Sequence, residues 1–510
     1  MVEKIFWLLT FIASISMCLF LISKVWFKWE TSPVIVTVSE HLVPVGKVPF
    51  PSVTICPQSK CIVSAYNYTA EKMKVDLFLT EKNASLNETM KHHLTKFAAV
   101  SQVCGKLFVN EYIRNKTYEL YGQQFTDKSL VNHLLEVAPT YLDVFADCTV
   151  RGSDVPCGEL FHKIVTSEGI CYNMNSLAAS EIFRPKPLQS DYPYLYANKL
   201  SQGWSIERGY STSDSFNKSS YYPMPGAENG ATPDVEIILI DYSENRDQLC
   251  NGINSGYKVY IQHPADLPQS SLYYYAVLHG QVSSMALSFG VLNTSNSLRG
   301  YDPEVLQCYF PDKRYLKYFK QYTASNCRIE CLSNMTFETC NCVEFYMPHN
   351  DSKTICTAQD IQCVADAREK VLEQESDKDT AVCHCLPSCN SATDYEAEIL
   401  KTDYNLKQFM KVFGSTINSK QDWKGYKFSK LDMYFKKPRY VSMRRSELFG
   451  LTDFLANCGG LLGLFLGFSF LSLVEIFYFL TLRLCCTLKK DLKEEKALAA
   501  KEPECQPEKF

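Results

Sequence analysis

Two long apolar runs, one near each end of the 510-residue chain, constrain its fold more than any other feature. The N-terminal run covers residues 5–26, and the C-terminal run covers residues 454–482 with a single full charge, Glu475. A transmembrane helix needs about 20 apolar residues, so each run can cross a bilayer once. The first run is longer than the apolar core of a signal peptide, about 7–15 residues, and no small-residue cleavage site follows it. We therefore expect two transmembrane helices.

The C-terminal run has more small and polar residues than a helix surrounded by lipid needs. Glycines at every fourth position share one helix face and allow close helix contacts; they are Gly459, Gly463 and Gly467. Ser469, Ser472 and Glu475 follow. A carboxylate at membrane depth costs roughly 2.5–3.5 kcal/mol, so Glu475 should face water or protein. Two readings stay open here: a pore-lining helix, or an anchor whose glycines contact a partner helix and whose Glu475 reaches toward the cytoplasm.

Basic residues after the second run indicate its orientation. Those nearest the membrane are Arg483, Lys489, Lys490 and Lys493. Because positively charged segments stay on the cytoplasmic side, we expect residues 483–510 to form a cytoplasmic tail. Two spans place both termini on the same side, so residues 1–4 are expected in the cytoplasm and residues 27–447 outside the cell.

The region between the runs has the composition of an extracellular domain. Of the 22 cysteines, 17 lie between Cys56 and Cys389, a density that suits disulfides in an oxidising compartment. Because this number is odd, at least one of them is unpaired or pairs with another chain. Eight glycosylation sequons also lie here: Asn67, Asn83, Asn87, Asn115, Asn217, Asn293, Asn334 and Asn350. The net charge of −4 includes no basic block suited to nucleic acid, so we expect no such partner.

Residue patterning in this region predicts strands and helices, and hence an α+β domain. The segment VIVTVSE, which begins at Val34, alternates apolar and polar residues, and residues 426–443 are also strand-like. If these strands pair, both transmembrane helices are attached to one sheet. Residues 69–103, 311–325 and 364–376 have helical patterns. The second of these helices would place three aromatic residues on one face, as core residues: Tyr315, Phe319 and Tyr322.

Ten cysteines around the last two helices predict a ladder of disulfides. Cys327 and Cys331 are expected to end the helix at 311–325, and three cysteines before the inner hairpin face three that return after it. This order favours nested pairs, which together would join two antiparallel helices. Each disulfide typically contributes ~2–4 kcal/mol to the free energy of unfolding. The expected pairs are Cys308–Cys389, Cys327–Cys385, Cys331–Cys383, Cys340–Cys363 and Cys342–Cys356.

A zinc site is the competing reading of the last cysteines. Its ligands would be Cys383, His384, Cys385 and Cys389. We favour disulfides because the compartment is oxidising and each cysteine has an available partner, so no metal site is expected. The chain also lacks H-E-x-x-H, G-x-S-x-G and phosphate-loop motifs, and we expect no enzyme.

Short motifs accompany the ladder and the polar second run. They are Phe50–Pro57 (FPSVTICP), Gly169–Asn175 (GICYNMN), Gly256–Val259 (GYKV) and Gly467–Ser469 (GFS). With these motifs, nearly the whole chain resembles the degenerin/epithelial sodium channel superfamily, and within it most closely the insect pickpocket channels. The resemblance implies a hand-like extracellular domain with palm sheet, finger, thumb and knuckle, in which the thumb covers about residues 308–389.

The resemblance also implies a channel in the plasma membrane. Three identical or related subunits would surround a sodium-selective, amiloride-sensitive pore lined by the second run, with Na⁺ as the permeant ion and no cofactor. Gly467, Phe468 and Ser469 match the family's selectivity filter. The other implied pore and gate positions are Ala456, Asn457, Gly460, Gly463 and Glu475. Ala456 aligns with a small residue at which bulky substitutions hold family members open. Lipid and an unidentified extracellular ligand or stimulus are the remaining expected contacts.

The family pattern implies further disulfides outside the ladder. Cys56 is expected to pair with Cys171, and Cys148 with Cys157. Three cysteines then remain, for which we expect a bridge between Cys61 and Cys104.

The chain departs from the family pattern in two places. Family members usually begin with a longer cytoplasmic segment that contains a His-Gly pair, so we expect a shortened form or different gating here. Acid-sensing relatives have a Trp just before the first ladder cysteine, whereas this chain has Val305, Leu306 and Gln307 there. Proton gating is therefore not expected. A two-span, scavenger-type receptor without a pore shares the topology and remains the alternative.

Overall fold

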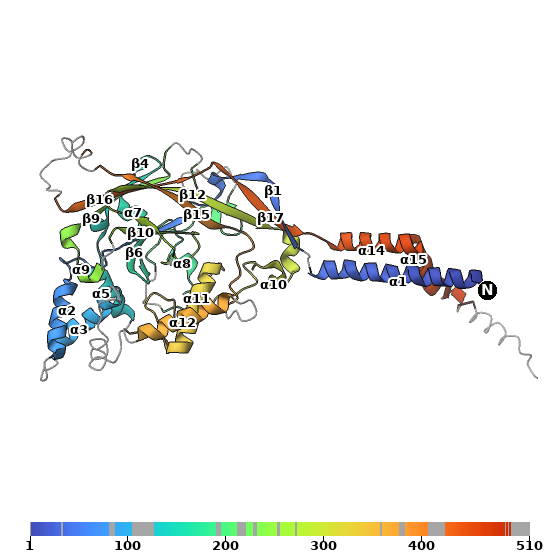
Figure 1. Cartoon of the computed structure of the whole chain (residues 1–510), viewed down its shortest axis with the longest axis horizontal. Helices are drawn as coiled ribbons and strands as arrows, with labels where there is room; N and C mark the ends of the chain where they lie inside the picture. Colours follow the sequence, from blue (N-terminus) through green and yellow to red (C-terminus); the bar gives the residue numbers. More distant parts are fainter. Residues whose placement is uncertain are drawn as a thin grey trace, which may run out of the picture. The chain divides into compact units, whose positions relative to one another are not determined.

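The computed structural model divides the chain into two compact units, Met1–Val36 with Arg445–Phe510 and Thr37–Arg444. Figure 1 shows the elements of each unit. The described residues are 2–31, 34–80, 87–104, 127–189, 195–211, 221–227, 232–251, 255–270, 273–357, 360–376, 383–405, 408, 424–484, 486–487 and 489–490.

The larger unit contains an eight-stranded sheet with the order β1-β17-β12-β16-β9-β3-β4, to which β15 adds by pairing with β12. Its strands are β1 (Val34–Pro44), β3 (Phe145–Val150), β4 (Ser153–Asp154), β9 (Val235–Tyr242), β12 (Gln281–Thr294), β15 (Ser391–Asp403), β16 (Tyr426–Phe435) and β17 (Arg439–Glu447). β12 pairs with β16 in parallel and with β15 antiparallel. The strand expected at Val34 is present as β1. The run expected at 426–443 is two strands, because Pro438 has no N–H to donate and lies at the turn between them.

The two strands that adjoin the apolar runs pair with each other, so the condition for attaching both runs to one sheet is met. Thr37 Oγ1 donates to the carbonyl of Arg444 (3.4 Å), and Ser442 Oγ donates to the carbonyl of His41 (3.3 Å). β1 and β17 therefore form one edge of the large sheet.

A second, five-stranded sheet brings together the three motifs that lie between the apolar runs. Its order is β11-β10-β2-β6-β5, with all neighbours antiparallel. The strands are β2 (Ser52–Pro57), β5 (His162–Thr166), β6 (Gly169–Met174), β10 (Tyr257–Gln262) and β11 (Tyr275–Val277). β2 lies between β6 and β10, and its six residues are all buried. Motifs that are about 120 and 200 residues apart in the sequence thus share the centre of one sheet.

Apolar side chains of both sheets form a common core. The cluster joins Val53 and Ile55 of β2 to Ile237 of β9, Met285 of β12 and Leu431 of β16, all of them fully buried. Because each sheet contributes one apolar face, the two sheets pack face to face.

In the larger unit the longer helices lie below the strands β12, β15 and β16 in the view of Figure 1. The longer ones are α2 (Tyr68–Thr80), α3 (Glu88–Ser101), α5 (Asp127–Val137), α11 (Ala324–Cys340) and α12 (Ile361–Ser376). The short ones are α6 (Tyr141–Val144), α7 (Cys157–Leu160), α8 (Ala179–Ile182), α9 (Gln248–Asn251) and α10 (Pro303–Leu306). The helix expected at 364–376 is α12, and the one expected at 69–103 is two helices, α2 and α3.

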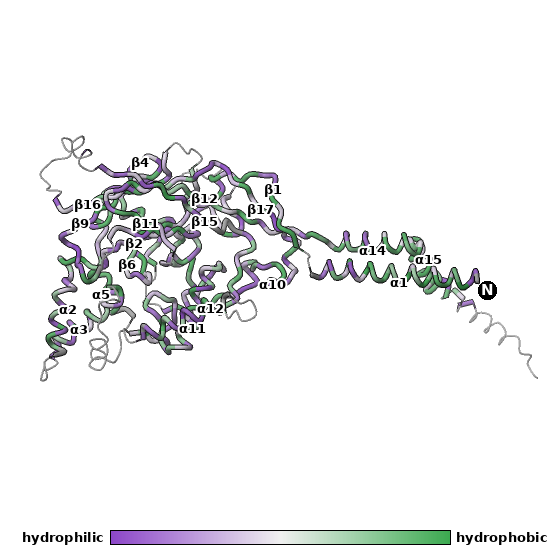
Figure 2. Tube along the Cα trace, viewed as in Figure 1, coloured by the Kyte–Doolittle hydropathy of each residue, from purple (hydrophilic) through white to green (hydrophobic). Residues whose placement is uncertain are grey.

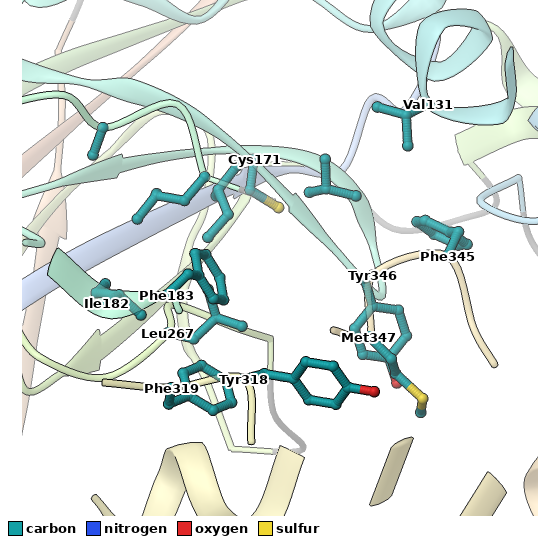
Figure 3. Packing of buried hydrophobic residues seen from close by; sticks show 14 of the residues in the cluster. Val131, Cys171, Ile182, Phe183, Leu267, Tyr318, Phe319, Phe345, Tyr346 and Met347 are labelled. Carbon is teal, nitrogen blue, oxygen red and sulfur yellow. The ribbon is translucent and has the colours of Figure 1, made fainter. Parts of the chain in front are cut away.

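The helix expected at 311–325 is absent, and α11 begins instead after the N-cap Thr323. The segment 311–323 has no helix because other parts of the chain satisfy its backbone. Glu330 of α11 accepts hydrogen bonds from two of its N–H groups (2.8 and 2.9 Å), and Arg184 donates to two of its carbonyls (3.1 and 2.8 Å). Figure 3 shows the segment's Tyr318 and Phe319 among the largest group of buried side chains. Tertiary contacts thus override the helical pattern.

Five disulfides form the predicted ladder, with the predicted partners: Cys308–Cys389, Cys327–Cys385, Cys331–Cys383, Cys340–Cys363 and Cys342–Cys356. Their setting differs from the prediction, because Cys327 and Cys331 lie near the start of α11 and do not end an earlier helix. The ladder therefore joins α11 to α12 and to the segment that follows α12. The zinc reading is wrong, since the sulfur atoms it required are in disulfides.

Three further disulfides lie outside the ladder. Cys56–Cys171 and Cys148–Cys157 are the pairs that the family pattern implied. The expected Cys61–Cys104 bridge is wrong, because Cys104 pairs with Cys250 and Cys61 is a buried free thiol. The sequence does not distinguish these partners, because the sulfur atoms of Cys61, Cys104 and Cys250 come close together only after folding.

A buried ion cluster stabilises the five-stranded sheet. Glu168, in the turn between β5 and β6, contacts Lys60 Nζ (2.9 Å), Lys258 Nζ (2.7 Å) and the hydroxyl of Tyr260 (2.7 Å). Burial alone would raise the pKa of Glu168, but the charge of Lys60 and the hydrogen bonds from Lys258 and Tyr260 lower this pKa to about 2. The carboxylate therefore stays ionised and links three separate segments.

We expect Glu168→Gln to lower the free energy of unfolding by about 3–5 kcal/mol near pH 7, because two largely buried ammonium groups lose their partner. The folded-state pKa lies below the ordinary value of 4.5, so the cluster contributes fully above pH 4.5 and is lost as the pH falls toward 2. Thermal unfolding of the two detergent-solubilised proteins should differ most at pH 7 and progressively less toward pH 3. The exposed Glu159→Gln is the control, and a pH-independent difference would contradict the assignment.

Candidate functional site

The smaller unit contains the helices of both apolar runs (Figure 2). Helix α1 (Val2–Thr31) includes Glu3–Glu30, which is long and apolar enough to cross a membrane. The second run is a pair of helices, α14 (Leu451–Leu466) and a following stretch from Phe470 to Arg483, that passes the same test only when taken together. The two parts are bent by 84° at a break of three residues. The expected single helix at 454–482 is thus interrupted.

The break coincides with the Gly-Phe-Ser motif. Gly467 has φ +64°, a left-handed conformation that residues with a Cβ rarely adopt, and its N–H donates to the carbonyl of Gly463 (3.0 Å). Ser469 then caps α15 (Phe470–Phe477) by accepting from the N–H of Ser472 (3.3 Å). A glycine that ends one helix and a serine that starts the next are the signals of a broken helix. The sequence contains both signals, although the family resemblance implies only a filter at these residues.

Helix α14 has two faces of different character. Its half-buried face carries Phe454, Cys458 and Phe465, and it packs on α1, where Trp29 stacks on Phe454 with ring centroids 5.2 Å apart. Ala456, Gly460, Gly463 and Gly467 are spaced four, three and four residues apart, so they follow one line on the opposite side. All four are exposed.

The small-residue face has room for a neighbour. A Cβ added at Gly459 or Gly460 would meet no heavy atom of the described chain within 4 Å, and one at Gly463 would first meet the carbonyl oxygen of Phe468 at 3.7 Å. Because α14 has no bulky groups along this line, another backbone can approach closely, or a narrow hydrated path can form between copies of the helix.

The start of α14 is fixed by its own polar groups. The N–H of Gly450 donates to the carboxylate of Asp453 (3.1 Å), and Asn457 Nδ2 donates to the carbonyl of Asp453 (2.8 Å). Asn457, which the resemblance places at the gate, therefore lies with its amide against the first turn of its own helix. Glu475 lies farther along, on α15, and is exposed.

Five of the eight sequons are in the described part of the chain. Asn67, Asn87 and Asn293 are exposed, and Asn334 and Asn350 are half-buried. Asn87 is also the N-cap of α3, since its Oδ1 accepts from the N–H of Met90 (2.8 Å); Asn67 Oδ1 accepts from the N–H of Ala70 (2.9 Å) at the start of α2. The sequons at Asn83, Asn115 and Asn217 lie outside the described residues.

Comparison with known proteins identifies the family of this chain. The family model described as amiloride-sensitive sodium channel matches residues 1–479. The chain belongs to this family of ion channels, which are not enzymes.

Several relatives are named sodium or acid-sensing channels. Pickpocket protein 28 of Drosophila melanogaster is 27% identical over 500 residues, covering 95% of this chain and 75% of the relative. The sodium channel protein Nach of the same organism is 21% identical over 510 residues, covering 98% of this chain and 85% of the relative. Acid-sensing ion channel 1C of Danio rerio is 23% identical over 488 residues, covering 94% of this chain and 78% of the relative.

We expect Gly467→Ala to disturb the helix break, because a left-handed alanine costs about 1–2 kcal/mol. Gly460→Ala is the matched control, since that position has ordinary helical geometry and open space around an added Cβ. Thermal unfolding of the solubilised protein should therefore shift to lower temperature for Gly467→Ala and stay unchanged or rise for Gly460→Ala. Equal shifts would argue against a required left-handed residue at 467.

Proposed function

We propose that this chain is a subunit of a trimeric, sodium-selective and amiloride-sensitive channel of the plasma membrane. The single observation that carries the proposal is the small-residue face of α14, which lies opposite its contact with α1 and ends in the break at residues 467–469. Family membership supports the proposal, and the pore-less receptor alternative receives no support from it.

In the proposed pore, three copies of α14 place this face toward a common axis. Ala456, Asn457, Gly460 and Gly463 line the gate. At Gly467 the helix ends, and the last carbonyls of a helix have no intrahelical partners. These carbonyls carry the negative end of the helix dipole, so they can replace part of the hydration shell of a cation. Three Ser469 hydroxyls add further oxygen ligands to the filter.

Glu475 has a separate role in this proposal. Three exposed carboxylates on α15 form a ring of negative potential on the cytoplasmic side of the filter, and such a ring raises the local cation concentration. In this placement the carboxylate faces water, so it avoids the free-energy cost of burying a charge at membrane depth.

The topology of the proposed subunit has two spans with both termini in the cytoplasm. The described sequons and all eight described disulfides then lie outside the cell, where an oxidising compartment maintains them. The two sheets correspond to the palm and neighbouring parts of a hand-like domain, α2 and α3 to the finger, and α11 and α12 to the thumb.

Gating is proposed to act through the large sheet. β1 follows α1 after two residues, and β17 precedes α14 by three residues. Because β1 and β17 pair, any movement of this sheet edge displaces the end of α1 and the start of α14 together. A stimulus that rearranges the extracellular domain therefore has a short covalent route to the pore.

We expect Ala456→Phe to raise the resting sodium current of cells that express the chain. A bulky ring on the small-residue face prevents three helices from closing at the gate. Leu455→Phe is the control, because residue 455 is exposed but lies off this line. Whole-cell recording checks the prediction, and an unchanged current for Ala456→Phe would remove residue 456 from the gate.

We expect Ser469→Leu to reduce the preference for sodium over potassium, because a larger apolar side chain replaces the hydroxyl ligand of the filter. Reversal potentials measured with each ion outside should move closer together. Ser23→Leu on α1 is the control. If Ser469→Leu conducts with an unaltered reversal potential, the filter lies elsewhere.

The function as a whole is tested by expression of the chain alone and with related subunits while extracellular stimuli are applied. An amiloride-sensitive sodium current that requires this chain supports the proposal. Surface protein that stays monomeric and passes no current under any combination would refute it.

A further inference from the structure

A free thiol lies beside a disulfide in the extracellular unit. The sulfur atoms of Cys61, Cys104 and Cys250 all lie within 4.8 Å of one another, and Cys104 is bonded to Cys250. The three residues are at most 1% exposed. Because Cys61 is separated from the other two by 43 and 189 residues, this meeting is a product of the fold.

Backbone contacts hold the three cysteines in place. Cys61 follows β2, and its neighbour Ile62 forms a β-bridge with Arg246, just before α9. Cys250 is on α9, where its N–H donates to Asp247 Oδ1 (3.0 Å). Cys104 follows α3, and its N–H donates to the carbonyl of Val100 (3.1 Å). The proximity therefore does not depend on side-chain rotamers alone.

Apolar packing surrounds the cysteine trio, by which we mean Cys61, Cys104 and Cys250. The same buried cluster contains Leu94, Phe97 and Val100 of α3, with Tyr68 of α2 stacked on Phe97 at 5.1 Å. External thiols and oxidants are excluded from such a site. Chemistry among the trio must accordingly proceed between its own members.

We propose that the cysteine trio is an internal thiol–disulfide exchange site. The Cys61 thiolate attacks Sγ of Cys104 or Cys250, a new disulfide forms, and the Cys104–Cys250 bond breaks. The displaced sulfur leaves as a thiolate and takes up the proton that Cys61 released. One disulfide and one thiol are present before and after, so the step needs no oxidant or reductant. This inference does not depend on the proposed channel function.

Each pairing ties different segments together. The Cys104–Cys250 bond joins the end of α3 to α9, whereas Cys61–Cys104 would join α3 to the segment after β2 and release α9. Cys61–Cys250 would instead release α3. Exchange thus changes which of the two helices is covalently attached, without any change in the number of disulfides.

The surroundings of Cys61 keep the exchange slow in the native state. Burial raises the pKa of the Cys61 thiol, and the nearby carboxylate of Asp247 raises it further. The other titratable groups facing Cys61 are the phenols of Tyr66 and Tyr68. Only the thiolate attacks, so exchange should accelerate at alkaline pH or when the cluster opens locally.

The test is disulfide mapping of the full-length protein purified from cell membranes. Samples are held without reductant at pH 7 and at pH 9, quenched in acid, alkylated under denaturing conditions, digested and analysed by mass spectrometry. We expect Cys104–Cys250 to predominate at first. A growing fraction of Cys61–Cys104 or Cys61–Cys250 should appear, at least tenfold faster at pH 9. Cys104–Cys250 as the sole linkage at both pH values would refute exchange.

Variants provide a second measurement that does not rely on slow kinetics. In Cys250→Ser, Cys61 should pair with Cys104 in most molecules at the cell surface. In the control Cys148→Ser, the stranded Cys157 should remain a free thiol, because no third sulfur of the described chain shares that site. A free Cys104 in folded Cys250→Ser, or a loss of surface protein equal to that of Cys61→Ser combined with Cys250→Ser, would contradict the proposal.

Discussion

The left-handed backbone at Gly467 is the constraint on which the broken helix of the second apolar run depends. In the proposed second span, a helix that ends there leaves carbonyls without partners where lipid supplies no water, so these carbonyls must face a hydrated space. One face of α14 packs on α1, and the small-residue face lies opposite. In the proposed pore, the hydrated space therefore lies along the small-residue face. The glycine and the serine two residues later thus determine where the helix stops and also which oxygens become available.

The larger unit, Thr37–Arg444, relies on a different kind of constraint. Three of the five ladder disulfides attach α11 to α12 or to the segment after it, while Glu330 of α11 accepts from the backbone N–H groups of Lys317 and Tyr318. The Cys56–Cys171 bond and the cluster around Glu168 stabilise the smaller sheet in the same way. Covalent and ionic links between segments distant in sequence therefore supplement the apolar core between the sheets.

Much of this architecture could be predicted because the relevant signals are local or ordered along the chain. The apolar runs, the strands at β1 and β16, the helix α12 and the nested order of the ladder all follow from patterns in the sequence. The segment at 311–325 does not form the predicted helix, because its helical periodicity competes with contacts to Glu330 and Arg184 that exist only after folding. The predicted partner of Cys104 is wrong for the same reason, since three-dimensional packing decides which sulfur atoms lie close together.

The helix caps at Asn67 and Asn87 bear on how sugar attachment to this protein should be studied. In each residue the carbonyl oxygen of the side chain holds a helix start, while the amide nitrogen is the atom that would carry the glycan. An Asn→Gln exchange at position 87 removes both functions, and loss of the cap alone costs about 1 kcal/mol. Thr89→Ala, at an exposed position, abolishes the acceptor motif and leaves the cap intact, so it separates defects of glycosylation from defects of folding.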